Sequence, residues 1–299
     1  LGDTRLNDGT AFRNICRAGG WQGAAFITSE EQALSKIETE GDAHSILFFN
    51  NHWLNVRIFW SLVEMKGLEI NERTAVLIDV DKTALGARGR NDGVIDQARL
   101  AAAQSTLQEI LGEDFQAENF QASYAVLNQP VFHTFTEDNQ DYLVYICLMG
   151  GCGFFDLAEL QAAAQAHRLM SFLEFLEQVN RRSGELPEKV RAVHKEVYAL
   201  VKAGDPTPFK QFRKAEYFAT TARMGQLGEE ASIEERLRHE IVITREVQEF
   251  ALASAAAGAL VFGISDKPDE ASTVDSLGSG TQALHQKRTH VVGGMHART

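Results

Sequence analysis

The sequence has few cysteines, and their spacing excludes a disulfide framework. Only Cys16, Cys147 and Cys152 are present, they are scattered along the chain, and no CxxC pair occurs. Reduced, packed thiols are therefore expected, as in cytosolic proteins. The nine histidines show no HxxxH spacing, which argues against a zinc site. Neither a GxSxG elbow, nor a P-loop, nor a GxGxxG loop after a strand is present.

Long apolar runs and an excess of positive charge are missing as well. No run approaches the ~20 residues that a membrane span needs, and the opening LGDTRLNDGT lacks the apolar core of a signal peptide. The formal net charge is −12, so the chain should repel nucleic acid. Hydrophobic residues make up 44% and charged residues 23%, which is typical of a folded protein. We therefore expect a cytoplasmic protein without a membrane or nucleic-acid partner.

Short apolar runs separated by helical segments occupy the two ends of the chain. Runs that are apolar throughout, rather than alternating, indicate strands covered on both faces. Strands that alternate with helices favour an α/β fold with a doubly wound, mostly parallel, Rossmann-like sheet. The expected strands are 24–28, 45–49, 75–78, 259–264 and 289–292, and the expected helices are 30–38, 53–66 and 244–257.

The middle of the chain has little strand character and is expected to be helical. A block of this length is the size of a domain. We therefore predict a core domain from 1–94 and 239–299, interrupted by a mainly helical domain at 95–238. Within it the expected helices are 95–111, 157–167, 170–180, 187–202 and 209–224.

Two aspartates follow the expected strand 75–78. The segment VLIDVDKT carries Asp79 and Asp81, followed by Thr83. Side chains alternate along an extended chain, so both carboxylates lie on one side, at the strand end where α/β sheets bind ligands. Two such carboxylates repel each other unless a cation lies between them or one is protonated, and Mg²⁺ prefers oxygen ligands of this kind. The alternative is that the aspartates cap a helix or a turn.

The segment VLIDVDKT resembles motif one of the haloacid dehalogenase-like superfamily, the hhhhDxDx[TV] signature. The resemblance implies a Rossmann-like core with a cap, and Asp79 as the nucleophile that forms an aspartyl-phosphate. Asp81 would be the general acid and base, and both aspartates would bind Mg²⁺. Dehalogenases of the family lack the second aspartate, so phosphoryl chemistry is favoured over carbon–halogen cleavage.

Further segments are similar to motifs two and three of the same superfamily. GALVFGISDKPDEAS at 258–272 has the form of motif two, an apolar strand that ends in Ser or Thr. It implies that Ser265 binds the phosphoryl group and that Lys267 lies near it. The lysine of motif three is expected at Lys287, with Lys267 as the alternative.

A counterpart of motif four, a further acidic metal ligand, is missing after Lys287. The strands expected at 24–28 and 45–49 precede motif one and could take the sheet positions that motif four usually occupies. Asn50 and Asn51 would then approach the metal, although an amide oxygen carries no charge. The alternative is that these asparagines cap the following helix.

Two arginines follow the paired aspartates in the loop GARGRND. The guanidinium groups of Arg88 and Arg90 suit a phosphate or carboxylate of the substrate. The sequence as a whole predicts a Mg²⁺-dependent phosphatase for a small phosphorylated metabolite. The alternatives are a protein of the same fold that binds a phosphorylated ligand or a partner without catalysis, and a phosphotransferase.

Overall fold

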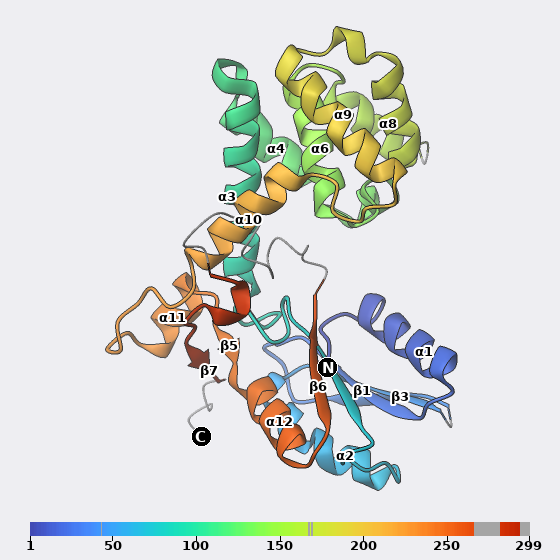
Figure 1. The fold of residues 1–299 in the computed structure, drawn as a ribbon, viewed down its shortest axis with the longest axis vertical. Coiled ribbons are helices and arrows are strands. Elements are labelled where there is room, and N and C mark those ends of the chain that lie inside the picture. The colour runs from blue at the N-terminus through green and yellow to red at the C-terminus, as the bar shows by residue number, and fades with distance from the viewer. Residues whose placement is uncertain (43, 167, 169, 266–281, 294–299) are drawn as a thin grey trace. The chain divides into compact units, whose positions relative to one another are not determined.

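The computed structural model describes residues 1–42, 44–166, 168, 170–265 and 282–293, and the chain divides into two compact units (Figure 1). The first comprises Leu1–Gln97, Thr220–Asp266 and Gln286–Thr299, and the second Ala98–Ala219 and Lys267–His285, as far as these residues are described. The main segment of the second unit lies within the predicted helical insertion 95–238. None of the described helices has the length and the apolar content of a membrane-spanning segment.

The described part of the first unit contains three small sheets and several helices. One sheet has the order β1-β3-β2, with β1 and β3 parallel and β2 antiparallel to β3. β4 pairs in parallel with β6, and β5 with β7. The strands are β1 (Gly23–Thr28), β2 (Ile37–Gly41), β3 (Ser45–Asn50), β4 (Ala75–Asp79), β5 (Ile243–Thr244), β6 (Leu260–Ile264) and β7 (Val291–Val292). The helices are α1 (Asn7–Gly19), η1 (Trp53–Ile58), α2 (Phe59–Met65), α11 (Ile233–His239), α12 (Arg245–Ala256) and η7 (Leu284–Gln286), the last beginning in the second unit.

The first two residues of the chain join two of these sheets. Leu1 and Gly2 lie between β4 and β1 and make the backbone hydrogen bonds of a parallel strand to both, near the N label in Figure 1. These bonds are Leu1 N to Leu77 O (2.7 Å), Asp79 N to Leu1 O (3.0 Å), Gly2 N to Phe26 O (3.1 Å) and Thr28 N to Gly2 O (3.1 Å). The segments β3, β1, Leu1–Gly2, β4 and β6 therefore follow one another with their carboxyl ends at a common edge.

Side chains from β1 and β3 enter two different cores, because successive residues of a strand point to opposite faces. Phe26 and Phe48 pack with residues of η1, α2 and α12. Ile27 and Leu47 pack on the other face with Phe12 of α1. Helices thus cover both faces of these strands, which explains why the runs are apolar throughout. The mixed α/β fold is confirmed with small sheets, and one large doubly wound sheet remains a prediction.

The predicted helix at 30–38 is wrong. No helix forms there, and the residues from Ile37 to Gly41 form β2, an edge strand paired with β3. The side chain of Asn51, which follows β3, binds the backbone of the preceding loop and so fixes its path. Glu38 and Glu40 are exposed on β2. Charges on an edge strand discourage pairing with another chain, so an acidic segment suits this position as well as it suits a helix.

The second unit is built from helices around α6, whose residues from Leu143 to Met149 are buried on all sides. Helices were predicted where α3, α7, α8, α9 and α10 occur, and these are confirmed apart from their ends. A helix that is apolar all round is hard to tell from a buried strand, and α6 was not predicted. The elements are α3 (Asp92–Leu111), η2 (Gly112–Asp114), α4 (Ala117–Leu127), η3 (Pro130–Phe132), α5 (His133–Thr136), α6 (Gln140–Gly151), α7 (Leu157–Gln165), α8 (Phe172–Arg181), η4 (Ser183–Glu185), α9 (Glu188–Lys202) and α10 (Lys210–Thr221), of which α3 begins and α10 ends in the first unit.

Candidate active site

Asp79 is the last residue of β4, and a tight turn follows it. The backbone N–H of Ala84 donates to Asp79 O at 3.1 Å, and that of Leu85 donates to Val80 O at 2.8 Å. Lys82 adopts a left-handed conformation with φ of 62°, which reverses the chain. The turn therefore leaves the Asp79 carboxyl at the carboxyl edge of the strand, as predicted for a ligand-binding position.

Three carboxyl groups meet at this edge. Asp3 directly follows the Leu1–Gly2 segment, Asp8 lies in the first turn of α1, and Asp79 ends β4. One oxygen atom from each lies within 4.8 Å of the other two. Neither Asp3 nor Asp8 was predicted as a site residue. The signal available was two aspartates in GDTRLND, but their meeting with Asp79 depends on the pairing of Leu1 and Gly2 with β4.

The position of Asp8 is fixed by local hydrogen bonds. Its Oδ2 atom accepts from the backbone N–H of Asp3 at 3.0 Å, from that of Thr4 at 2.8 Å and from the Thr4 hydroxyl at 2.8 Å. A Cβ atom on Gly2 would lie 2.5 Å from Asp8 Cγ, so this approach requires glycine at position 2. The carboxyl group is thus held against the backbone next to Asp3.

The electrostatics of the cluster favour protons or a cation. Burial raises the pKa of Asp79 to about 8, and the charges of Asp8 and Asp3 raise it as well. Burial also raises the pKa of Asp3 to about 6, against the opposing effect of the Arg88 guanidinium. Three carboxylates cannot all be ionised at this spacing without compensation. At neutral pH the cluster therefore holds a proton that a bound cation would displace.

Thr83 places a buried hydroxyl next to Asp79. The residue is 0% exposed, and its Oγ1 atom has no hydrogen-bond partner among the described residues. It nevertheless lies close enough to lower the pKa of Asp79, so the hydroxyl approaches that carboxyl without reaching good hydrogen-bond geometry. Its carbonyl accepts from the Thr244 hydroxyl at 2.6 Å, which anchors the turn.

The structure brings the two predicted motifs onto neighbouring strands. β6 pairs with β4 in a register that sets Ile264 opposite Asp79, and Val80 N donates to Ile264 O at 2.9 Å. Ser265 follows directly and is exposed at the same edge. Asp81 is half-buried within the turn after β4 and forms a β-bridge with Leu85.

The two predicted arginines have different surroundings. Arg88 donates through Nε to the Oδ2 atom of Asp3 and so reaches the acidic cluster. The side chain of Arg90 is 7% exposed and donates to Glu30 Oε2 at 2.8 Å and to Glu246 Oε2 at 2.9 Å. A substrate-binding role for Arg90 would require these two ion pairs to break, whereas the role predicted for Arg88 needs no such change.

The asparagines predicted as metal ligands lie away from Asp79. β3 is separated from β4 by β1 and the Leu1–Gly2 segment, which corresponds to ~14 Å at the usual strand spacing. Asn50 Oδ1 accepts from His52 N at 2.8 Å, which is an Asx turn and not the helix cap of the alternative, because His52 is the N-cap of η1 and no side chain caps that helix. Asn51 binds Lys36 N and Leu34 O, both at 2.8 Å. The residues of the N-terminal segment that lie next to Asp79 are therefore Asp3 and Asp8, not the two asparagines.

Of the two predicted lysines, Lys287 is the one that the described part of the chain contains. Lys287 lies between η7 and β7, and no described ion pair joins its ammonium to Asp3, Asp8 or Asp79. Lys267 lies outside the described residues. Lys82, which lies in the turn after Asp79, donates to Asp96 at 2.8 Å.

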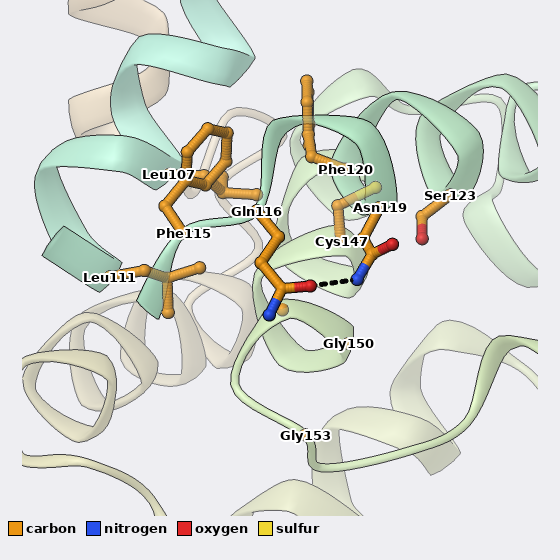
Figure 2. Close-up of a pocket in the computed structure, with 11 residues that line it drawn as sticks. Leu107, Leu111, Phe115, Gln116, Asn119, Phe120, Ser123, Cys147, Gly150 and Gly153 are labelled. Carbon is orange, nitrogen blue, oxygen red and sulfur yellow. Dashed lines mark hydrogen bonds between the residues drawn. The ribbon is translucent and has the colours of Figure 1, made fainter. Parts of the chain in front are cut away.

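A separate cavity of about 260 Å³ lies within the second unit, between α3, α4 and α6 (Figure 2). Figure 2 shows its lining to be apolar side chains with Gln116, Asn119 and Ser123. Its one thiol, Cys147, has a pKa raised by burial, which disfavours the reactive thiolate. The cavity therefore offers no acid, base or nucleophile, and the candidate active site is the acidic cluster.

No family model matches the chain, and neither a curated protein nor a solved structure matches it.

Proposed function

We propose that this chain is a Mg²⁺-dependent phosphatase of the haloacid dehalogenase-like type, acting on a small phosphorylated metabolite. The observation that supports this most is the meeting of Asp3 and Asp8 with Asp79 at one sheet edge. Asp3 and Asp8 then take the part of the acidic metal ligand of motif four. The proposal includes a Rossmann-like core, a cap formed by the helical unit, and a cytoplasmic location.

The residues of the cluster fit a hard divalent cation. Carboxylate oxygens are the ligand atoms that Mg²⁺ prefers. Three carboxyl groups at one sheet edge carry more negative charge than the neighbouring cationic groups of the protein neutralise. The unpartnered hydroxyl of Thr83 beside Asp79 indicates a polar site with unused hydrogen-bonding capacity. Asp3, Asp8, Asp79 and Asp81 would hold the ion. When bound, it supplies positive charge that favours ionised Asp79 and offsets charge on the phosphoryl oxygens.

The protein's own groups then divide the reaction into two steps. The Asp79 carboxylate attacks phosphorus, and the bond between phosphorus and the leaving oxygen breaks, which leaves an aspartyl-phosphate. Asp81 gives its proton to the leaving oxygen, and later takes a proton from the water that hydrolyses the aspartyl-phosphate. The hydroxyl of Ser265 donates a hydrogen bond to a phosphoryl oxygen.

One observation favours a second function, phosphate-ester binding without turnover. The pKa of Asp79 is raised to about 8, and a protonated carboxyl is no nucleophile. The two functions differ in whether a cation lowers that pKa enough to release the proton.

Hydrolysis of para-nitrophenyl phosphate with and without Mg²⁺ tests the proposal. We expect Mg²⁺-dependent turnover in the wild type, and a loss of ~1,000-fold or more in Asp79→Asn because the nucleophile is removed. Asp8→Asn should weaken Mg²⁺ binding. Asp114→Asn, at an exposed aspartate of the second unit, is the matched control and should behave as the wild type. Phosphate binding without turnover in the wild type would establish the second function instead.

A further inference from the structure

Among the described residues, one cationic side chain contacts the acidic cluster, and the α-amino group of Leu1, whose pKa burial lowers to about 6, lies near Asp8 and Asp79. Lys82 is paired with Asp96, and Arg90 with Glu30 and Glu246. Lys287 has no described ion pair with any cluster aspartate. The guanidinium of Arg88 does contact the cluster, through Asp3.

The backbone of Arg88 is fixed from three directions. Its N–H donates to Lys82 O at 2.7 Å, and its carbonyl accepts from Glu30 N at 2.9 Å and from the Trp53 indole N–H at 3.0 Å. Trp53 is fully buried, so the anchor is part of the core. The arginine therefore extends from a rigid position rather than from a free loop.

Its side chain is held at one nitrogen and open at the others. Nε donates to Asp3, whose side chain is 6% exposed, while the Arg88 side chain is 34% exposed. Its terminal Nη1 and Nη2 atoms have no partner among the described residues. A guanidinium oriented through Nε presents its two terminal amino groups as a planar fork, which matches two oxygens of a phosphate group.

We propose that Arg88, oriented by Asp3, binds the phosphoryl group of the substrate and supplies the charge expected of a motif-three lysine at Lys287. This inference rests on the proposed function. Asp3 then has two roles, because its carboxylate orients the Arg88 guanidinium and also contributes to the cation site. The second, independent sign of a ligand here is the buried, unpartnered hydroxyl of Thr83 directed at Asp79. The ligand class is a phosphate monoester dianion.

A salt bridge that only stabilises the fold is the competing explanation for Arg88. It predicts that replacing Arg88 changes the midpoint of unfolding but leaves phosphate affinity as it was. Arg88→Lys separates the two, because lysine keeps the charge beside Asp3 but has no planar fork.

Calorimetric titration of inorganic phosphate in the presence of Mg²⁺ tests the proposal. We expect Arg88→Ala to weaken phosphate binding ~10- to 100-fold, the usual effect of losing charge-assisted hydrogen bonds, and Arg88→Lys to restore part of it. Lys287→Ala should bind phosphate as the wild type does. Arg73→Ala, at an exposed arginine of the same unit, is the matched control. Thermal unfolding of each variant, with and without Mg²⁺, reports folding and cation binding separately.

Each outcome decides a different question. Unchanged phosphate affinity in Arg88→Ala, or a loss in Lys287→Ala instead, would overturn the role of Arg88 while the proposed function stands. A wild type that shows neither Mg²⁺-dependent stabilisation nor phosphate binding would overturn the proposed function and this inference with it. If Arg88→Ala does not fold, the test rests on Arg88→Lys. A phosphate affinity of Arg88→Lys equal to that of the wild type would then show that the planar guanidinium is not needed to bind phosphate.

Discussion

Each unit of the molecule contains a cluster of charged side chains, half-buried in the first unit and buried in the second, and the two clusters are composed differently. In the second unit Asp141 accepts from Arg213 at 2.6 Å, Arg213 donates to Glu216 at 2.8 Å, and Arg99 donates to Glu216 at 2.9 Å. Two carboxylates there face two guanidiniums. In the first unit three carboxyl groups face the guanidinium of Arg88 and the α-amino group of Leu1, whose pKa burial lowers to about 6.

The difference separates a structural cluster from a candidate binding site. Alternating charges with complete hydrogen bonding need nothing from outside, and they tie α6 to α10 and α3. Excess charge of one sign is stable only if it binds protons or a cation. The cluster at Asp79 therefore has a capacity for ligand that the cluster at Asp141 lacks.

The largest effect is expected from breaking the compensated cluster. Asp141 is 0% exposed, and Asp141→Asn leaves the Arg213 guanidinium with less than its full complement of negative charge. We expect a loss of ~3–5 kcal/mol in the free energy of unfolding, measured with urea. Asp114→Asn in the same unit should cost less than ~0.5 kcal/mol.

The response to Mg²⁺ should be unaffected in Asp141→Asn as long as the protein is folded. A variant that is as stable as the wild type, or one that is folded but no longer stabilised by Mg²⁺, would remove the distinction between the two clusters.

The next effect concerns pH in the absence of divalent cations. Burial raises the pKa of Asp79 to about 8 from its ordinary value of 3.8, so the native state binds more protons than the unfolded state between these values. The free energy of unfolding should therefore fall as pH rises from about 4 to 6, by up to ~1.4 kcal/mol per pH unit for one group. Above pH 6 the Leu1 α-amino group, whose pKa burial lowers from 8.0 to about 6, contributes with the opposite sign. Urea unfolding at pH 4, 5 and 6 in EDTA measures the slope.

Asp79→Asn should reduce this slope, and Mg²⁺ should reduce it as well by displacing the proton. Asp3, with a pKa raised to about 6, contributes with the same sign over the lower part of the window. A slope that is unchanged in Asp79→Asn would show that the proton is not held at this carboxyl.

Several parts of the fold and the site were predictable because they depend on local patterns. The strands β1, β3, β4 and β6 were predictable because each is a continuous apolar run in the sequence. The position of Asp79 and Asp81 after β4 was predictable for the same reason. The parts that were missed depend on pairing between distant segments. Asp3 and Asp8 belong to the site only because Leu1 and Gly2 pair with β4, and two residues carry no strand pattern of their own.

The helix wrongly predicted at 30–38 and the ligand role assigned to Asn50 and Asn51 share a cause. The residues from Glu30 to Glu38 have good helix propensity, but the edge of β3 and the side chain of Asn51 determine their path. Tertiary contacts override local propensity in such segments. The same contacts engage the carboxamide of Asn51 in hydrogen bonds to the loop backbone instead of a metal ion.

The smallest effect separates two descriptions of Thr83. Its hydroxyl is buried without a hydrogen-bond partner among the described residues, yet it lies near enough to Asp79 to lower the pKa of that carboxyl. Thr83→Val keeps the shape of the side chain and removes only the hydroxyl. If the hydroxyl is unpartnered in the cation-free protein, its removal leaves no new unsatisfied group, and the free energy of unfolding in EDTA should change by less than ~1 kcal/mol.

With Mg²⁺ and phosphate present, the same variant should lose affinity, because the hydroxyl then has a ligand to bind. A cost of ~1–3 kcal/mol already in EDTA would mean that Thr83 donates a full hydrogen bond to Asp79 and that the acidic cluster is more nearly satisfied by the protein itself. Comparison of the two conditions therefore measures how far the cluster at Asp79 depends on a ligand, which is the property that distinguishes it from the cluster at Asp141.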